Sequence, residues 1–118
     1  MSKKCPIEHT ISLINGKWKI IILKELSQEP LRYGSLGKRI KGISSKILIQ
    51  QLREMEKDSL IVREVFPEVP PRVEYSLSEK GESIFKIFVE LRRWGLDENE
   101  SEIVECLNCK KCIPFLEH

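Results

Sequence analysis

Hydrophobic positions in the first third of the chain recur at three- and four-residue spacing, which is typical of helices that bury one face. This spacing covers residues 8–14, 17–27 and 33–40, and we expect one helix in each segment. Asn15–Gly16 and Pro30 separate the segments, because Asn-Gly is a turn signal and proline does not continue a helix. The residues that the second helix is expected to bury are Trp18, Ile21, Ile22 and Leu26.

A fourth helix is predicted to begin at Ser44 or Ser45 and to reach about Lys57. Serine is a good N-cap because its hydroxyl accepts a hydrogen bond from a backbone N–H of the first turn. Gly42 can adopt the left-handed conformation that ends the preceding helix. Two helices joined by such a short turn form a helix-turn-helix, in which the second helix reads DNA. The periodicity directs Ile47 or Leu48, Leu52 and Met55 inward and leaves Lys46, Ile49, Gln50, Arg53 and Lys57 nearer the surface.

Two strands are expected after this helix, at Leu60–Phe66 and Arg72–Leu77. The second strand alternates, with Val73, Tyr75 and Leu77 on one face and Arg72, Glu74 and Ser76 on the other. The connecting segment, residues 67–71, contains three prolines, which stiffen a loop and cannot extend a strand ladder. A helix-turn-helix followed by a hairpin is the arrangement of a winged helix.

A longer helix is predicted from Ser78 onward, and its apolar face is broad. A small winged helix has too little core to cover such a face, so we expect packing on the N-terminal helix or on a second subunit. The residues assigned to a dimer interface are Ile84, Phe88, Leu91 and Trp94. The predicted fold class is mainly α with a small β-hairpin (α+β), a winged helix-turn-helix with N- and C-terminal dimerisation helices.

The composition of the chain indicates a single globular domain, since 41% of the 118 residues are hydrophobic and 32% are charged. The longest apolar run is far shorter than the roughly 20 residues of a membrane span, and the N-terminus lacks the apolar stretch of a secretory signal. We therefore expect a cytoplasmic protein with reduced cysteines. We divide it into a DNA-binding domain (1–95), an acidic, cysteine-rich helical tail (96–115) and a Leu-Glu-His end (116–118) that resembles the start of an expression tag.

Charge is distributed unevenly along the chain, although the net charge is only +2. Residues 32–72 carry nine Lys or Arg against five Asp or Glu, and their excess of +4 leaves −2 for the remainder. Within this region, residues 32–46 contain five basic residues and no acidic one, whereas residues 97–105 contain five acidic residues and no basic one. The first region can face a polyanion such as DNA, which would repel the second.

Taken together, these residues resemble the HxlR-type transcriptional regulators, a bacterial winged-helix group related in architecture to the MarR proteins. The resemblance covers about residues 5–95, and its stretches are Cys5–Glu8, Leu13–Trp18, Arg32–Tyr33 with Leu36, Gly42–Ser44 through Gln50–Glu54, Pro67–Tyr75, Leu77–Gly81 and Trp94–Gly95. It implies a homodimer, assembled through the N- and C-terminal helices, that binds a short pseudo-palindromic operator with one recognition helix and one wing per half-site. Ser59 departs from the family pattern, which usually has glycine there, and should mildly strain its turn.

Candidate DNA contacts lie on the reader helix and in the basic residues around it. Backbone amides at a helix N-terminus favour phosphate. Gln50 can pair bidentately with adenine, and Arg53 with guanine or a phosphate. The full set of candidates is Arg32, Lys38, Arg39, Ser44, Ser45, Lys46, Ile49, Gln50, Arg53 and Arg72.

Simpler interpretations remain open for several of these residues. Ser44 can be only a helix cap. Arg72 can enter the minor groove, or it can be a solvated charge that forms ion pairs across the hairpin. Arg32, Lys38 and Arg39 are candidates for phosphate contacts, but each can equally belong to a solvated surface.

Cysteines provide a candidate regulatory input. Cys5 stands beside Lys3, Lys4 and a helix start, which favour the reactive thiolate, although a free cysteine can also serve merely as a small hydrophobic residue. The resemblance adds that some family members sense electrophiles, oxidants or aldehydes through a cysteine at the position of Cys5.

Cys106, Cys109 and Cys112 form a C-x2-C-x2-C tail outside the region of resemblance. Three such ligands can hold zinc or an iron–sulfur cluster if a fourth comes from Cys5, a second subunit or an exogenous group. They can also act as a thiol switch, or form an inert tail. We expect no required cofactor.

We therefore expect a homodimeric, sequence-specific DNA-binding transcriptional regulator that responds to thiol-reactive signals. The alternatives are a metal- or thiol-binding protein that uses the winged helix only as a dimer scaffold, and a regulator without cysteine sensing. The chain contains no Gly-rich phosphate loop, no Ser/His/Asp set and no H-E-x-x-H motif, so no catalytic residue is predicted.

Overall fold

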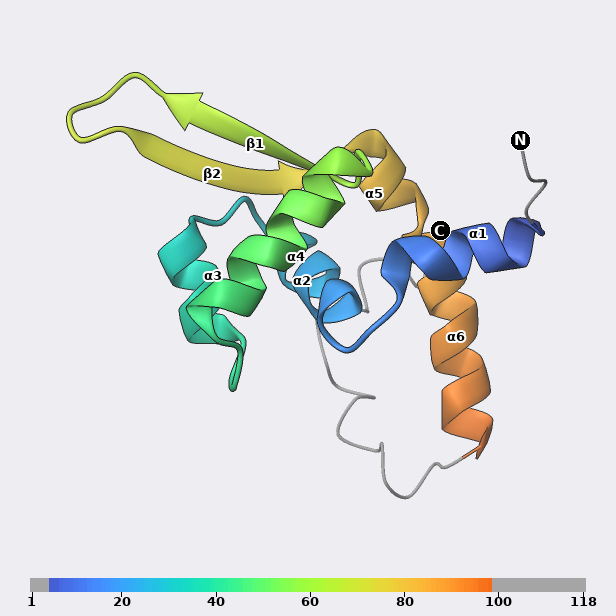
Figure 1. The fold of residues 1–118 in the computed structure, drawn as a ribbon. Helices are drawn as coiled ribbons and strands as arrows, with labels where there is room; N and C mark the ends of the chain where they lie inside the picture. The colour runs from blue at the N-terminus through green and yellow to red at the C-terminus, as the bar shows by residue number, and fades with distance from the viewer. Residues whose placement is uncertain (1–4, 99–118) are drawn as a thin grey trace.

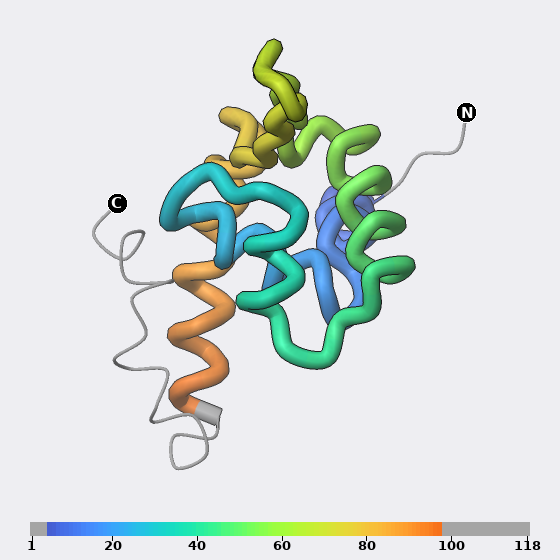
Figure 2. The backbone as a smooth tube through the Cα atoms, turned by 90° about the vertical axis from the view of Figure 1, so that its left-hand side faces the viewer, coloured from blue at the N-terminus to red at the C-terminus, as the bar shows by residue number. Residues whose placement is uncertain are grey.

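The computed structural model describes residues 5–98 and confirms the predicted winged helix (Figure 1). In chain order the elements are α1 (Pro6–Ile14), α2 (Trp18–Leu26), α3 (Tyr33–Arg39), α4 (Ser45–Lys57), β1 (Ile61–Phe66), β2 (Arg72–Leu77), α5 (Glu79–Ser83) and α6 (Phe85–Glu98). The hairpin extends from one side of the helical body, and α6 runs away from the body on the other side, so that the two lie far apart (Figures 1 and 2). Within residues 5–98, no helix is long and apolar enough to cross a membrane.

The helix-turn-helix consists of α3, a turn at residues 40–44, and α4. Gly42 has a φ of +85°, the left-handed conformation predicted for the end of the first of these helices. Ser44 is the N-cap of α4, and its Oγ accepts a hydrogen bond of 3.2 Å from the Ile47 N–H, as predicted. These two residues reverse the chain, so that α4 packs back on the body with Leu48 buried.

One hydrophobic core joins the helices to the base of the hairpin. Helix α4 contributes Leu48, Leu52 and Met55, the inward face that its periodicity predicted, while Ile47 is only half-buried. The buried hydrophobic residues are Ile14, Ile22, Leu23, Leu26, Leu31, Leu36, Ile40, Leu48, Leu52, Met55, Leu60, Ile61, Ile84, Phe85 and Phe88. Because the helices and the base of the hairpin all contribute side chains to this one core, the reader helix and the wing have a common support.

Helix α2 is buried on more sides than its spacing predicted. Ile22 and Leu26 are buried as expected, Trp18 and Ile21 are only half-buried, and Leu23 is fully buried. The reason is its position, since α2 packs against α3, α4 and β2. A helix in such a position has little surface left for solvent.

The central position of α2 also buries a lysine. The Lys19 side chain is 8% exposed, and its Nζ lies 3.4 Å from Glu54 Oε2 and 3.5 Å from Asn15 Oδ1. A buried charge requires such partners. Lys19 therefore connects the turn after α1 to the reader helix α4.

The hairpin begins one residue later than predicted, at Ile61. Leu60 belongs to the C-terminal turn of α4 instead, because its N–H donates a 2.9 Å hydrogen bond to the Met55 carbonyl. Ser59, just before it, has a φ of +64°, which confirms the strained turn expected where serine replaces glycine. The register then runs from Ile61 opposite Leu77 to Phe66 opposite Arg72.

The prediction of a single long helix after Ser78 is wrong in one respect, because the structure divides this segment into α5 and α6 at Ile84. Ser78 caps α5 by accepting a 3.0 Å hydrogen bond from the Gly81 N–H. At the division, the Ile87 N–H donates to the Ile84 carbonyl only three residues earlier, a tighter turn than in an α-helix. This bend lets α5 dock on the hairpin base while Phe85 enters the core.

Gly81 is required for that docking, because an added Cβ would clash with the Leu60 carbonyl oxygen. Gly81→Ala is expected to lower the free energy of unfolding by about 2 kcal/mol or more, measured by urea denaturation followed by circular dichroism. Gly34→Ala is the control, since its Cβ meets nothing within 4 Å and alanine favours a helix by roughly 0.5–1 kcal/mol. A Gly81→Ala variant as stable as the wild type would show that α5 does not pack this closely.

Candidate nucleic-acid interface

Helix α4 presents a polar, basic surface opposite its buried face. Lys46, Gln50 and Arg53 are exposed on it, and Ile49 lies beside them with 39% exposure. With Glu54, these residues line a shallow groove of about 750 Å³. The structure thus brings together the predicted contacts of the reader helix on one accessible surface.

Lys38 of α3 lies close to the start of α4. It lines a hollow of about 250 Å³ together with Ser44 and Ser45, between the two helices of the helix-turn-helix. Tyr33 lines the same hollow, and its Oη donates a 3.3 Å hydrogen bond to the Ser45 carbonyl. This arrangement places a lysine beside a helix N-terminus, where both charge and backbone N–H groups favour an anion.

The other two basic candidates near α3 differ in their surroundings. Arg32 is exposed at the N-cap position of α3. Arg39 is exposed too, but its Nη2 forms a 2.6 Å ion pair with Glu29 Oε1. A phosphate would therefore have to compete with a carboxylate at Arg39, whereas no carboxylate of residues 5–98 forms an ion pair with Arg32.

Arg72 is bound within the wing. Its Nη2 lies 3.1 Å from Glu68 Oε2, its Nε lies 3.7 Å from Glu74 Oε2, and the guanidinium lies 4.0 Å from the centre of the Phe66 ring. Of the two interpretations left open for this residue, ion pairing is present in the structure, but its partners are Glu68 in the loop and Glu74 on the same strand and not residues of the opposite strand. To enter a minor groove, Arg72 would have to exchange these two carboxylates for contacts with DNA.

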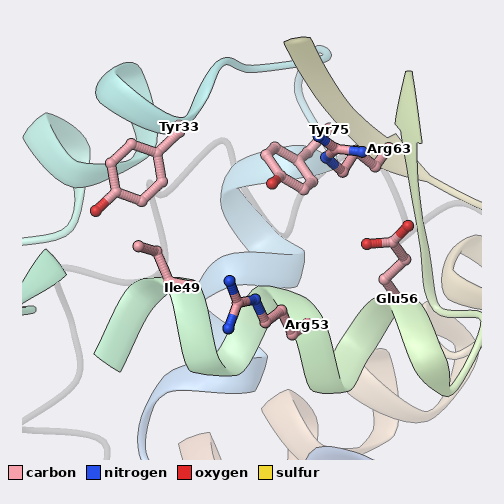
Figure 3. Close-up of a pocket in the computed structure, with 6 residues that line it drawn as sticks. All are labelled: Tyr33, Ile49, Arg53, Glu56, Arg63 and Tyr75. Atoms are coloured by element: carbon pink, nitrogen blue, oxygen red, sulfur yellow. The ribbon is translucent and has the colours of Figure 1, made fainter. Parts of the chain in front are cut away.

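A cleft of about 460 Å³ separates α4 from the hairpin and α3 (Figure 3). It is lined by Tyr33, Ile49, Arg53, Glu56, Arg63 and Tyr75. In Figure 3, Glu56 extends from α4 toward the hairpin, Arg53 extends along α4 toward Ile49, and Arg63 lies next to the Tyr75 ring. The cleft is continuous with the exposed surface of α4, because Ile49 and Arg53 also line the groove beside Lys46.

Four of these residues are absent from the contacts predicted from sequence, namely Tyr33, Glu56, Arg63 and Tyr75. Arg63 stands directly opposite Tyr75 in the hairpin, so the two side chains share one face. The alternation of β2 placed Tyr75 on its apolar face, but only the register shows that Arg63 joins it. Sequence spacing alone carries no signal for that register.

The N- and C-terminal helices leave apolar side chains on the surface. Ile7 and Ile11 of α1 are 72% and 52% exposed, and Leu91 and Trp94 of α6 are 50% and 68% exposed. Of the residues assigned to a dimer interface, Ile84 and Phe88 are buried in the core of the single chain. The apolar surface of α6 therefore consists of its outer part, which includes Ile87, Leu91 and Trp94.

Cys5 is exposed at the N-cap position of α1. The backbone N–H groups of Glu8 and Ile7 at the start of α1 lower the pKa of its thiol below the ordinary value, because they favour the thiolate. The helix start thus has the effect expected of it, whereas Lys3 and Lys4 lie outside the described residues.

The tail cysteines Cys106, Cys109 and Cys112, and the zinc or iron–sulfur site predicted there, also lie outside the described residues. Within residues 5–98, no three His, Cys, Asp or Glu side chains gather in a way that could hold a metal ion.

Comparison with known proteins agrees with this architecture. The family model described as HxlR-like helix-turn-helix matches residues 13–103. A regulatory protein named MalR from Fusobacterium mortiferum is 48% identical over 93 residues, which cover 78% of this chain and 88% of that protein.

Solved structures give the same result. The redox regulator HypR in its reduced form superposes with a TM-score of 0.75 and 35% identity, over 86% of this chain and 99% of that one. The reduced transcriptional regulator YodB from Bacillus subtilis gives a TM-score of 0.74 and 34% identity, over 80% of this chain and 93% of that one. The chain therefore belongs to the HxlR-like helix-turn-helix family of transcriptional regulators.

Proposed function

We propose that this regulator is a homodimer that binds operator DNA, with helix α4 of each subunit in the major groove and each wing against the adjacent backbone. The observation that carries the proposal is the surface of α4, where Lys46, Gln50 and Arg53 are exposed together on a helix whose opposite face is buried. A helix fixed in this way can enter a groove without losing its support from the core.

The side chains on α4 can perform two separable tasks. Gln50 carries both a donor and an acceptor, which match the adenine edge in the major groove. Lys46, with Ser45 and Lys38 near the helix start, supplies positive charge and N–H groups for phosphates. Base contacts give sequence preference, while phosphate contacts give affinity for any duplex.

Dimerisation is supported by the apolar surface of the terminal helices. Trp94, Leu91 and Ile11 are each at least half exposed, and water-exposed apolar side chains of this size favour burial in an interface. Two subunits joined through these helices would present two copies of α4 to half-sites about 34 Å apart, one turn of DNA.

The proposed input is the thiol of Cys5. It is exposed, its pKa is lowered, and it lies at the start of α1, one of the helices proposed for the dimer interface. HypR is described as a redox regulator, and YodB has also been solved after diamide treatment. Oxidation or alkylation of Cys5, alone or with Cys106, Cys109 and Cys112, would alter the dimer helices and hence the spacing of the two reader helices.

The second candidate is a regulator without cysteine sensing, and the exposed α4 supports it equally well. A zinc or iron–sulfur centre at the tail cysteines, or a role of the winged helix as scaffold only, rests on sequence spacing alone.

Gln50→Ala is expected to weaken operator binding by about 1–3 kcal/mol while binding to unrelated DNA stays nearly unchanged, because the amide contacts a base. Lys46→Ala should weaken both equally and reduce the dependence of log K on log salt by about one per subunit. The measurement is fluorescence anisotropy on the DNA upstream of the gene at two salt concentrations. If Gln50→Ala bound operator and unrelated DNA with equal losses, base reading by α4 would be excluded.

Leu91→Glu is expected to dissociate the dimer, because it places a charge in the apolar surface of α6 without disturbing the subunit core. Sedimentation equilibrium should show a shift to the monomer, and operator affinity should fall with it. Lys86→Glu, an exposed position on α6 outside the apolar residues, is the matched control and should remain dimeric. A fully dimeric Leu91→Glu variant would argue against this interface.

Cys5→Ser is expected to leave operator binding of the reduced protein intact and to remove its response to diamide. Because its pKa is lowered, Cys5 should keep its thiolate at a lower pH than an ordinary cysteine does. The rate of its alkylation by iodoacetamide should therefore begin to fall only at that lower pH. Peptide mass spectrometry after timed alkylation measures this rate. An unchanged diamide response in Cys5→Ser would exclude Cys5 as the sensor and assign sensing to the tail cysteines.

A further inference from the structure

The cleft between α4 and the hairpin contains two arginines, Arg53 and Arg63, that form no ion pair within the part of the chain that the structure describes. Among residues 5–98, neither Arg53 nor Arg63 has a carboxylate within ion-pair distance, although Arg39, Arg72 and Arg93 all do. Both line the same cleft, one from the reader helix and the other from the wing (Figure 3).

The hairpin register explains why Arg63 reaches the cleft. Ile61 opposite Leu77 lies at the base of the hairpin, where Ile61 is buried in the core. Two residues further out on the same face stand Arg63 and Tyr75. The core therefore continues outward as a basic, aromatic surface at the point where the hairpin leaves α4.

On the opposite wall, helix α4 contributes residues at successive turns. Ile49, Arg53 and Glu56 follow one another at four- and three-residue spacing, so they share one side of the helix. Arg53 also lines the groove beside Lys46 and Gln50. It thus belongs both to the surface that is proposed to face bases and to the cleft under the wing.

The chemistry of the cleft suits a phosphodiester. A guanidinium group presents a rigid fork of N–H donors that matches two phosphate oxygens, and two such groups can bind one anion from either side. The Tyr33 and Tyr75 rings add apolar walls for the adjoining sugar. Glu56 reduces the charge of the cleft, from two cations to a net charge of +1.

We propose that this cleft binds a phosphate of the DNA backbone between α4 and the wing, held jointly by Arg53 and Arg63, and that Glu56 limits the strength of this contact. The proposal rests on the proposed function, because it requires α4 to lie against DNA. A DNA strand is favoured over a free small anion because the cleft opens directly into the exposed groove of α4.

Arg63→Gln tests the contact on DNA. It should lower affinity about tenfold, equally on the operator and on unrelated DNA of the same length, and reduce the salt dependence of log K by about one per subunit. Arg63→Lys should retain most of the salt dependence of wild-type binding, because it keeps the positive charge. It should recover little of the affinity that Arg63→Gln loses, because lysine lacks the forked N–H donors of the guanidinium group. Lys86→Gln removes an equal charge from an exposed position on α6 and should change neither quantity appreciably.

Glu56→Gln tests the same cleft by a change in DNA affinity of the opposite sign. It should raise affinity severalfold on both DNAs, whereas Glu64→Gln, on the other face of the same hairpin, should not. Thermal denaturation of each variant checks that the fold is retained. Because all comparisons are made against wild-type binding, absence of wild-type binding would refute the proposed function itself rather than the cleft.

Two results would overturn the cleft proposal. One is an Arg63→Gln variant that behaves like Lys86→Gln while Gln50→Ala still weakens operator binding. The other is a loss confined to the operator, which would make Arg63 a base contact. If Glu56→Gln and Glu64→Gln strengthened binding equally, the role of Glu56 would be overturned and only general electrostatics would remain.

Discussion

The burial of one face of α4 is the constraint on which the rest of this structure depends. Leu48, Leu52 and Met55 pack against a core shared by α2 and the base of the hairpin, which fixes the rotation of the helix about its own axis. Because that rotation is fixed, Lys46, Gln50 and Arg53 have nowhere to lie but on the surface. The capping hydrogen bond of Ser44 and the left-handed Gly42 then determine where the helix begins.

The same core supports the other parts that DNA binding requires. The base of the hairpin is buried with α4, so the wing and the reader helix share one support and enclose a cleft of about 460 Å³ between them. Lys19, buried in α2, connects the turn after α1 to Glu54 on the reader helix. This contact joins the C-terminal end of α1 to α4, whereas Cys5 lies at the N-terminal end of α1.

Much of this architecture was predictable from local chemistry, and the remainder was not for identifiable reasons. The serine cap, the glycine turn and the apolar spacing of α4 act within a few residues, so the sequence contains their signals. The buried Lys19 depends on α2 being covered from several sides, and the division at Ile84 depends on the contact between Gly81 and Leu60. Arg63 belongs to the candidate site because it stands opposite Tyr75 in the hairpin. This register relates two strands, so the spacing of residues within one strand cannot reveal it.

The assignment of α4 as the DNA-reading element is tested most directly by an NMR titration of the isotope-labelled protein with duplex DNA from the upstream region. We predict that the amide signals of Lys46, Gln50 and Arg53 on α4 and of Arg63 on the wing shift with saturable binding, while those of Leu52 and Met55 on the buried face shift far less. Shifts confined to α1 and α6, or none at saturating DNA concentrations, would contradict the assignment of α4 as the DNA-reading element.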